Sequence, residues 1–176
     1  FGALALALAV TAIVSFNGLN GVDKDAQKLS DRDVDALLQL VTISEDFLAA
    51  DGDVVRHLYV EDGDVKAQDA RAETIAGWAE EADEALAAIG SQIESPEGKQ
   101  VFSDFVAAYR EFESSAAKAV ELSRQETVDG VEEREGSRTL YTGTVLKRLE
   151  GLDVIHDQLE EVIAGQAAAQ ADDAKA

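Results

Sequence analysis

The stretch ESPEGKQVFSDFVAAYREFESSAAKAV, residues 94–120, carries the clearest helical signal in this chain. Ser95 is a favourable N-cap, and Pro96, the only proline, suits the first position of a helix. Apolar residues then recur at spacings of three and four, which places them on one helical face. They are Val101, Phe102, Phe105, Tyr109, Phe112, Ala116 and Val120. We therefore predict a helix from Pro96 to about Glu126.

Three other segments repeat this pattern on both sides of that helix. They cover about residues 23–60, 65–91 and 137–174, with turn-forming residues near 61–64, 91–95 and 127–136. Long helices joined by short loops pack as antiparallel neighbours. The sequence therefore predicts an all-α fold, an antiparallel up-down-up-down four-helix bundle over residues 23–176.

One stretch of the first segment competes with this interpretation. Residues 54–60, VVRHLYV, lie between Asp51-Gly52 and Asp62-Gly63 and have the composition of a β-strand between two turns. A lone strand would have no sheet to join. We therefore predict that the helix continues through Gly52 and ends near Asp62-Gly63.

Composition excludes several classes of function. The chain has 176 residues, 15 Lys and Arg against 36 Asp and Glu, and a net charge of −21. Such a surface repels the phosphates of DNA and RNA. The absence of cysteine rules out disulfides, thiolate metal sites and a cysteine nucleophile.

Residues 1–22, FGALALALAVTAIVSFNGLNGV, contain no charged side chain. As a helix they would span about 33 Å, close to the thickness of a bilayer core. We predict a transmembrane helix here, with a signal-peptide apolar region as the alternative. The bundle would then be extracytoplasmic, and its fourth helix would end back at the membrane.

The chain resembles the four-helix-bundle sensory domain of bacterial methyl-accepting chemotaxis proteins. The apolar segment runs into VSFNGLNGV (residues 14–22), DVVRHLYVEDGD (residues 53–64) resembles the end of the family's first helix, and ESPEGKQVFSDFVAAYREF (residues 94–112) resembles the start of its third. The resemblance implies a homodimer in a plasma or inner membrane that binds a small molecule or a binding protein. It also implies that a helix displacement carries the signal across the membrane.

The resemblance also suggests two ligand-binding residues. Well-known members hold a ligand carboxylate with arginines late in the first helix and with a hydroxyl early in the fourth. Arg56 fits the first position, and Thr142 the second, with Thr139 and Thr144 as alternatives. Those members place several arginines there, whereas this chain has one. The alternative is a solvated Arg56 that pairs with Glu61 or Asp53.

No pattern in the sequence predicts a metal site, a cofactor or catalysis. His57 and His156 would lie about 20 Å apart along the bundle axis, too far to share a metal. Asp153-x-x-His156 matches only half of a di-iron motif, and neither Asp-Gly-Asp stretch has EF-hand spacing. Trp78, Tyr109 and Tyr141 either line a pocket or belong to the core. We expect a non-enzymatic receptor module. The alternatives are the input domain of a sensor kinase or a cyclic-nucleotide signalling enzyme, or a membrane-anchored structural bundle.

Overall fold

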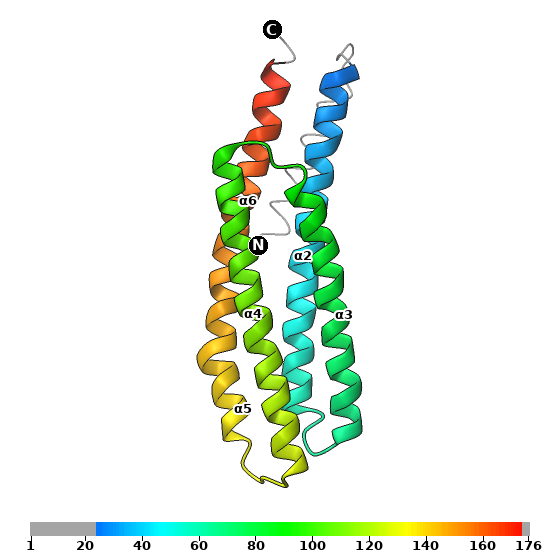
Figure 1. The fold of residues 1–176 in the computed structure, drawn as a ribbon, viewed down its shortest axis with the longest axis vertical. Helices are drawn as coiled ribbons and strands as arrows, with labels where there is room; N and C mark the ends of the chain where they lie inside the picture. Colours follow the sequence, from blue (N-terminus) through cyan, green and yellow to red (C-terminus); the bar gives the residue numbers. More distant parts are fainter. Residues whose placement is uncertain (1–23, 174–176) are drawn as a thin grey trace.

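The computed structural model describes residues 24–173, and the side chains of residues 34–169 within them. The helices are α2 (Lys24–Tyr59), α3 (Val65–Gly90), α4 (Pro96–Val128), α5 (Glu135–Leu140), a π-helical segment η1 (Tyr141–Val145) and α6 (Leu146–Asp173). Since α5, η1 and α6 follow one another without a break, they form the fourth long helix of a bundle (Figure 1). Residues 24–173 contain no strand, as predicted. The predicted membrane helix, residues 1–22, lies outside the described residues.

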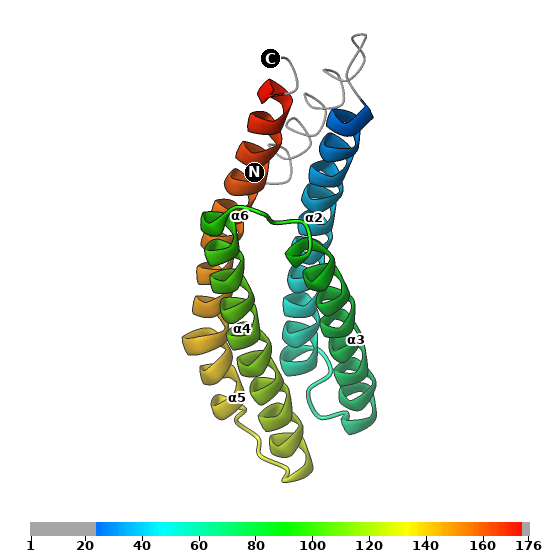
Figure 2. The ribbon, with the colours of Figure 1, turned by 45° about the horizontal axis from the view of Figure 1, so that its top comes forward.

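The four helices alternate in direction. α2 packs against α3 and α6, and α4 packs against the same two helices, which gives the predicted up-down-up-down order. The loops 60–64 and 129–134 meet at one end of the bundle, which we call the two-loop end. α2 and α6 extend beyond the third loop, residues 91–95, at the opposite end (Figures 1 and 2).

The stretch that could have formed a strand is helical. α2 continues through Gly52 to Tyr59, and Val54 and Leu58, one turn apart, are both fully buried. Gly63 then adopts a φ of +87°, a left-handed conformation that glycine adopts at little cost. Val54, His57 and Leu58 therefore face the core from one side of the helix.

The start of α4 follows the predicted capping geometry. The backbone N–H of Gly98 donates to the Ser95 side-chain oxygen over 2.9 Å, and Pro96 occupies the first turn. Gly98 is buried, and a Cβ atom there would lie 2.7 Å from the Ile93 methyl group and 3.0 Å from Val162. A glycine at this position therefore allows the 91–95 loop and α6 to approach α4 closely.

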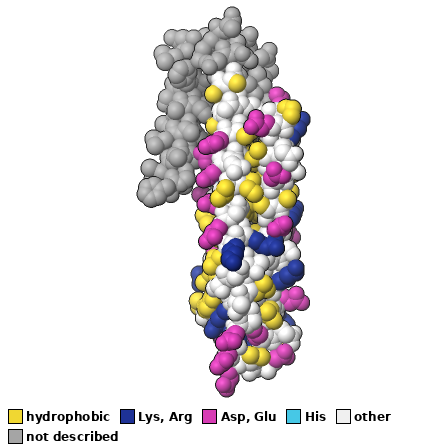
Figure 3. Space-filling model, turned by 90° about the vertical axis from the view of Figure 1, so that its left-hand side faces the viewer, with side chains coloured by type: hydrophobic (Ala, Val, Ile, Leu, Met, Phe, Trp, Pro, Cys, Tyr) yellow, Lys and Arg dark blue, Asp and Glu magenta, His cyan; other side chains and the backbone are white. Residues whose placement is uncertain are grey.

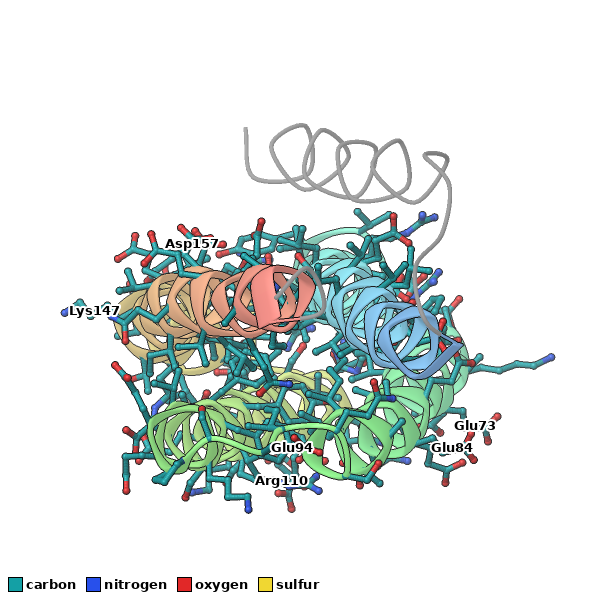
Figure 4. The ribbon with its side chains drawn as sticks, turned by 90° about the horizontal axis from the view of Figure 1, so that it is seen from above. Glu73, Glu84, Glu94, Arg110, Lys147 and Asp157 are labelled. Carbon is teal, nitrogen blue, oxygen red and sulfur yellow. The ribbon has the colours of Figure 1, made fainter. Side chains whose placement is uncertain are left out.

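The core follows the predicted stripes. Its largest fully buried apolar side chains are Leu37, Leu40, Ile43, Phe47, Leu58, Ile89, Phe105, Phe112, Leu152, Leu159 and Ile163. Charged side chains point outward, for example Glu73 and Glu84 on α3, Arg110 on α4 and Asp157 on α6 (Figure 4). None of the helices between residues 24 and 173 combines the length and the apolar composition needed to cross a bilayer.

Candidate ligand-binding region at the two-loop end

Two arginines near the start of the fourth helix meet the α2–α3 loop at the two-loop end. Arg134, in the loop after α4, pairs with Asp62 at 2.5 Å, and Arg138 of α5 pairs with the other oxygen of Asp62 at 2.8 Å. The guanidinium of Arg138 also lies over the ring of Tyr59, 4.8 Å from its centroid, in cation–π geometry. Asp62 therefore connects the α2–α3 loop to the start of the fourth helix.

A polar hollow of about 540 Å³ opens beside these arginines. It is lined by Tyr59, Glu132, Glu133, Arg134, Glu135, Arg138, Thr139 and Thr142. Both arginines already pair with Asp62, and three glutamates add negative charge. Acidic side chains also gather at the lower end of the face that Figure 3 shows. Within one subunit, this hollow is therefore a poor site for an anion.

The predicted ligand-binding residue Arg56 lies outside that hollow. Its side chain is exposed and forms no ion pair with the described residues. The expectation that Arg56 pairs with Glu61 or Asp53 is wrong, because Arg71 holds both carboxylates, at 2.6 and 2.9 Å. Arg71 is on α3, and the turn after Gly63 brings it back alongside α2, where it is closer to these acids.

The second predicted residue, Thr142, lines the hollow and is exposed. Its hydroxyl donates to the Arg138 carbonyl, 2.9 Å away in the preceding turn of its own helix. Thr142 belongs to η1, where the N–H of Leu146 donates to the carbonyl of Tyr141, five residues back. Such π-helical turns widen the helix and occur often at functional sites. The structure thus separates the two predicted residues: Thr142 lines this hollow and Arg56 does not.

A comparison with protein families supports the sensory interpretation of this arrangement. Residues 1–164 match the model of the four helix bundle sensory module for signal transduction. The chain belongs to this family. No curated protein and no solved structure matches it significantly. The match covers most of the chain, so the bundle is a sensory module of the methyl-accepting chemotaxis type.

The sensory module also has a buried polar layer near its two-loop end, which the sequence pattern did not predict. The Gln68 amide donates to the carbonyl of His57 at 3.3 Å and to the hydroxyl of Ser123 at 3.2 Å. The His57 side chain is fully buried, and neither ring nitrogen has a hydrogen-bond partner. Burial lowers the pKa of this imidazole, although the nearby acids Glu61 and Asp69 oppose the shift. His57 is therefore neutral at pH 7.

A second buried polar pair fixes the start of the fourth helix. The Glu126 carboxylate accepts hydrogen bonds from the backbone N–H of Ser137, at 3.1 Å, and from its hydroxyl, at 2.5 Å. Both residues are buried. Ser123 and Glu126 continue the spacing of the buried residues Ala116 and Val120 on α4. Polar residues at positions where the helical pattern expects core residues are the sequence signal for these buried polar contacts.

The described residues contain one group that could hold a metal ion. Ligand atoms of His156, Asp157 and Glu160 lie within 4.8 Å of one another on α6. The Nε2 atom of His156 is 3.3 Å from the Leu40 carbonyl, and Asp157 is largely exposed. This group does not include Asp153, the partner considered from the sequence. Two exposed or half-exposed acids next to a core histidine do not amount to a metal centre.

Proposed function

We propose that this sensory module is extracytoplasmic, works as a homodimer and binds a small molecule that changes the position of its fourth helix relative to the first. Residues 1–22 would form the first membrane crossing, and Arg56 and Thr142 would contact the ligand. The module would have no enzymatic activity and no resident cofactor. The observation that carries this proposal is the family match over a bundle whose first and last helices project at the same end.

The geometry of the fourth helix supports transmission of a signal. α5, η1 and α6 run without interruption from Glu135 at the two-loop end to Asp173 at the opposite end, about 58 Å at 1.5 Å per residue. Thr142 lies near the start of this helix. A ligand that favours one of two packings of the helix would move its far end by the same displacement.

Exposed apolar residues on α2 support a dimer interface there. Leu38 and Leu48 are 49% and 57% exposed although both are large and hydrophobic. Leu38 and Arg56 are 18 residues apart, which is five full helical turns, so they lie on the same face of α2. In a dimer formed along this face, the exposed Arg56 side chains of both subunits would lie at the interface. A carboxylate ligand would then meet arginines from both subunits.

The dimer can be tested by cysteine cross-linking because the chain has no native cysteine. Leu38→Cys in the full chain in membranes should form a disulfide-linked dimer on mild oxidation. Glu73→Cys, on the outer face of α3, is the matched control and should remain monomeric (Figure 4). Equal cross-linking of both variants would argue against a dimer along α2.

Signalling can be tested in a chimera. The chain would be joined to the second crossing and cytoplasmic part of a characterised chemoreceptor, and kinase output measured against a panel of amino acids and dicarboxylates. We expect at least one probe to change the output, and Arg56→Ala to raise the required concentration about tenfold or more. Arg148→Ala, an exposed arginine paired with Glu111, is the control. A membrane-inserted chimera that responds to no probe would contradict the proposed carboxylate site.

A further inference from the structure

A second candidate site, which shares no residue with the polar hollow, lies between α3 and α4. It is a groove of about 550 Å³, a volume typical of small-molecule sites, which usually range from about 300 to 1,000 Å³. Alanines form much of its walls, including Ala76 and Ala79 on α3 and Ala116 and Ala117 on α4, and Ala50 of α2 also lines it. Because these side chains are small, α3 and α4 leave space that larger residues would fill. We propose that this groove binds an apolar small molecule that carries one positive charge.

Tyr109 provides an unused polar group in the groove. The side chain lines the groove and only 3% of it is exposed. Its hydroxyl makes no hydrogen bond with the described residues, although the ring contacts the Arg110 guanidinium at 5.7 Å. Burial, together with Glu113 and Asp83, raises the pKa of Tyr109, so the hydroxyl is un-ionised at neutral pH. The oxygen of a neutral phenol has lone pairs that can accept a hydrogen bond from the N–H of a ligand ammonium group.

The charge around the groove favours a cation. Arg110 is shared between Asp83, at 2.6 Å, and Glu113, at 2.8 Å, and is therefore already neutralised. Glu80 of α3 and Glu121 of α4 also line the groove, are exposed and form no ion pair within the described part of the chain. Arg124 also lines the groove but pairs with Asp69 at 2.5 Å, so the two glutamates leave the rim with net negative charge.

A buried acid one turn from Ala50 adds to the negative potential. Asp46 of α2 is buried, and one of its carboxylate oxygens has no hydrogen-bond partner. Burial raises its pKa, and the neighbouring acids Glu81 and Glu45 raise it further. An incoming cation would lower the free energy of this cluster, whereas an anion would raise it.

The local charge of the rim favours a small cation over a second copy of the chain. A copy docked symmetrically on this groove would bring its own Glu80 and Glu121 against the same two carboxylates. An amphipathic cation supplies both the apolar surface and the opposite charge that the groove lacks. This groove is separate from the proposed carboxylate site, and binding to the groove can be measured without any signalling output.

The test uses calorimetry to measure how three matched probes bind to the full chain in phosphatidylcholine nanodiscs. The probes are 4-phenylbutylammonium, the neutral 4-phenylbutanol and the anionic 4-phenylbutanoate. We expect saturable binding of one ammonium probe per chain, about 2- to 10-fold weaker binding of the alcohol, and no measurable binding of the carboxylate. Equal or tighter binding of the alcohol or the carboxylate would overturn the charge selectivity, and absence of saturable binding would overturn the site.

Variants show whether a probe binds in the groove, in the lipid or elsewhere on the protein surface. Ala76→Phe places a large side chain in the groove from an exposed position on α3 and should abolish binding. If that variant unfolds, Ala117→Phe makes the same test from an exposed position on α4. Glu80→Gln with Glu121→Gln should remove the preference for the ammonium probe. The control, Glu73→Gln with Glu84→Gln, changes the same charge on the outward face of α3 and should have no effect (Figure 4).

Two outcomes of the variant series would overturn the proposal. One is unchanged ammonium binding by a folded Ala76→Phe chain. The other is a wild-type dimer that Ala76→Phe converts to a monomer, measured by mass in the same nanodiscs, since the groove would then be an interface between two copies.

Discussion

Replacing His57 with leucine is expected to stabilise the protein. The imidazole is fully buried, and neither ring nitrogen has a hydrogen-bond partner. At pH 7 the neutral ring carries one donor and one acceptor, and each buried unsatisfied group costs about 1–3 kcal/mol. Leucine removes both groups, while a shape mismatch costs up to about 1.5 kcal/mol. With both groups at the lower end of that range, less the mismatch, we expect a net gain of about 0.5–2 kcal/mol, or about 1–8 °C in Tm for a domain of this size.

The effect depends on pH in a direction that follows from the lowered pKa of His57. Below its ordinary pKa near 6.5, the unfolded imidazole binds a proton that the folded one does not, so acid favours unfolding of the wild type. The leucine variant lacks this linkage. Its advantage should therefore grow as the pH falls from 7 towards 5, by at most about 1.4 kcal/mol per pH unit.

The assay is chemical and thermal unfolding of the full chain, followed by circular dichroism at several pH values. His156→Leu is the matched control, since that buried histidine lies 3.3 Å from the Leu40 carbonyl and its loss should cost about 1 kcal/mol. A His57→Leu chain that is less stable than the wild type would refute the reasoning. A stability difference that stays constant from pH 7 to pH 5 would also refute it.

Three further predictions concern stability. Gly98→Ala should lower the free energy of unfolding by about 1–3 kcal/mol, because the new Cβ would lie 2.7 Å from an isoleucine methyl group. Gly77→Ala, where a Cβ would meet nothing within 4 Å, should raise it by up to about 1 kcal/mol. Thermal unfolding measures both changes. Glu126→Ala should leave the Ser137 N–H and hydroxyl without a hydrogen-bond partner and lower the free energy of unfolding by about 2–4 kcal/mol. Amide hydrogen exchange over residues 135–145 should become faster, and unchanged exchange would contradict the prediction. Burial raises the pKa of Asp51, so the folded state binds the proton more tightly and stability falls as the pH rises through that pKa. Asp51→Asn should therefore raise Tm at pH 7 but not near pH 3.

The sequence by itself determined where the helices lie. Helix ends depend on local groups, such as the Ser95 cap, Pro96 and the left-handed Gly63, which are visible in a short stretch of sequence. The buried faces depend on a period of 3.6 residues, which the apolar spacings of Phe105, Tyr109 and Phe112 display. For this reason the predicted bounds of the described helices differ from the observed ones by only one or two residues.

Only the tertiary structure decided which side chains meet. Arg71, and not Arg56, holds Glu61 and Asp53, and Arg134 reaches Asp62 across 72 residues of chain. Such pairings depend on the rotation and axial offset of neighbouring helices, which the packing of the whole core sets. The buried polar layer around His57 and the groove between α3 and α4 depend on the same rotation and offset of the helices. Periodicity gives the face of a helix that is buried, but it does not give the residue that lies opposite.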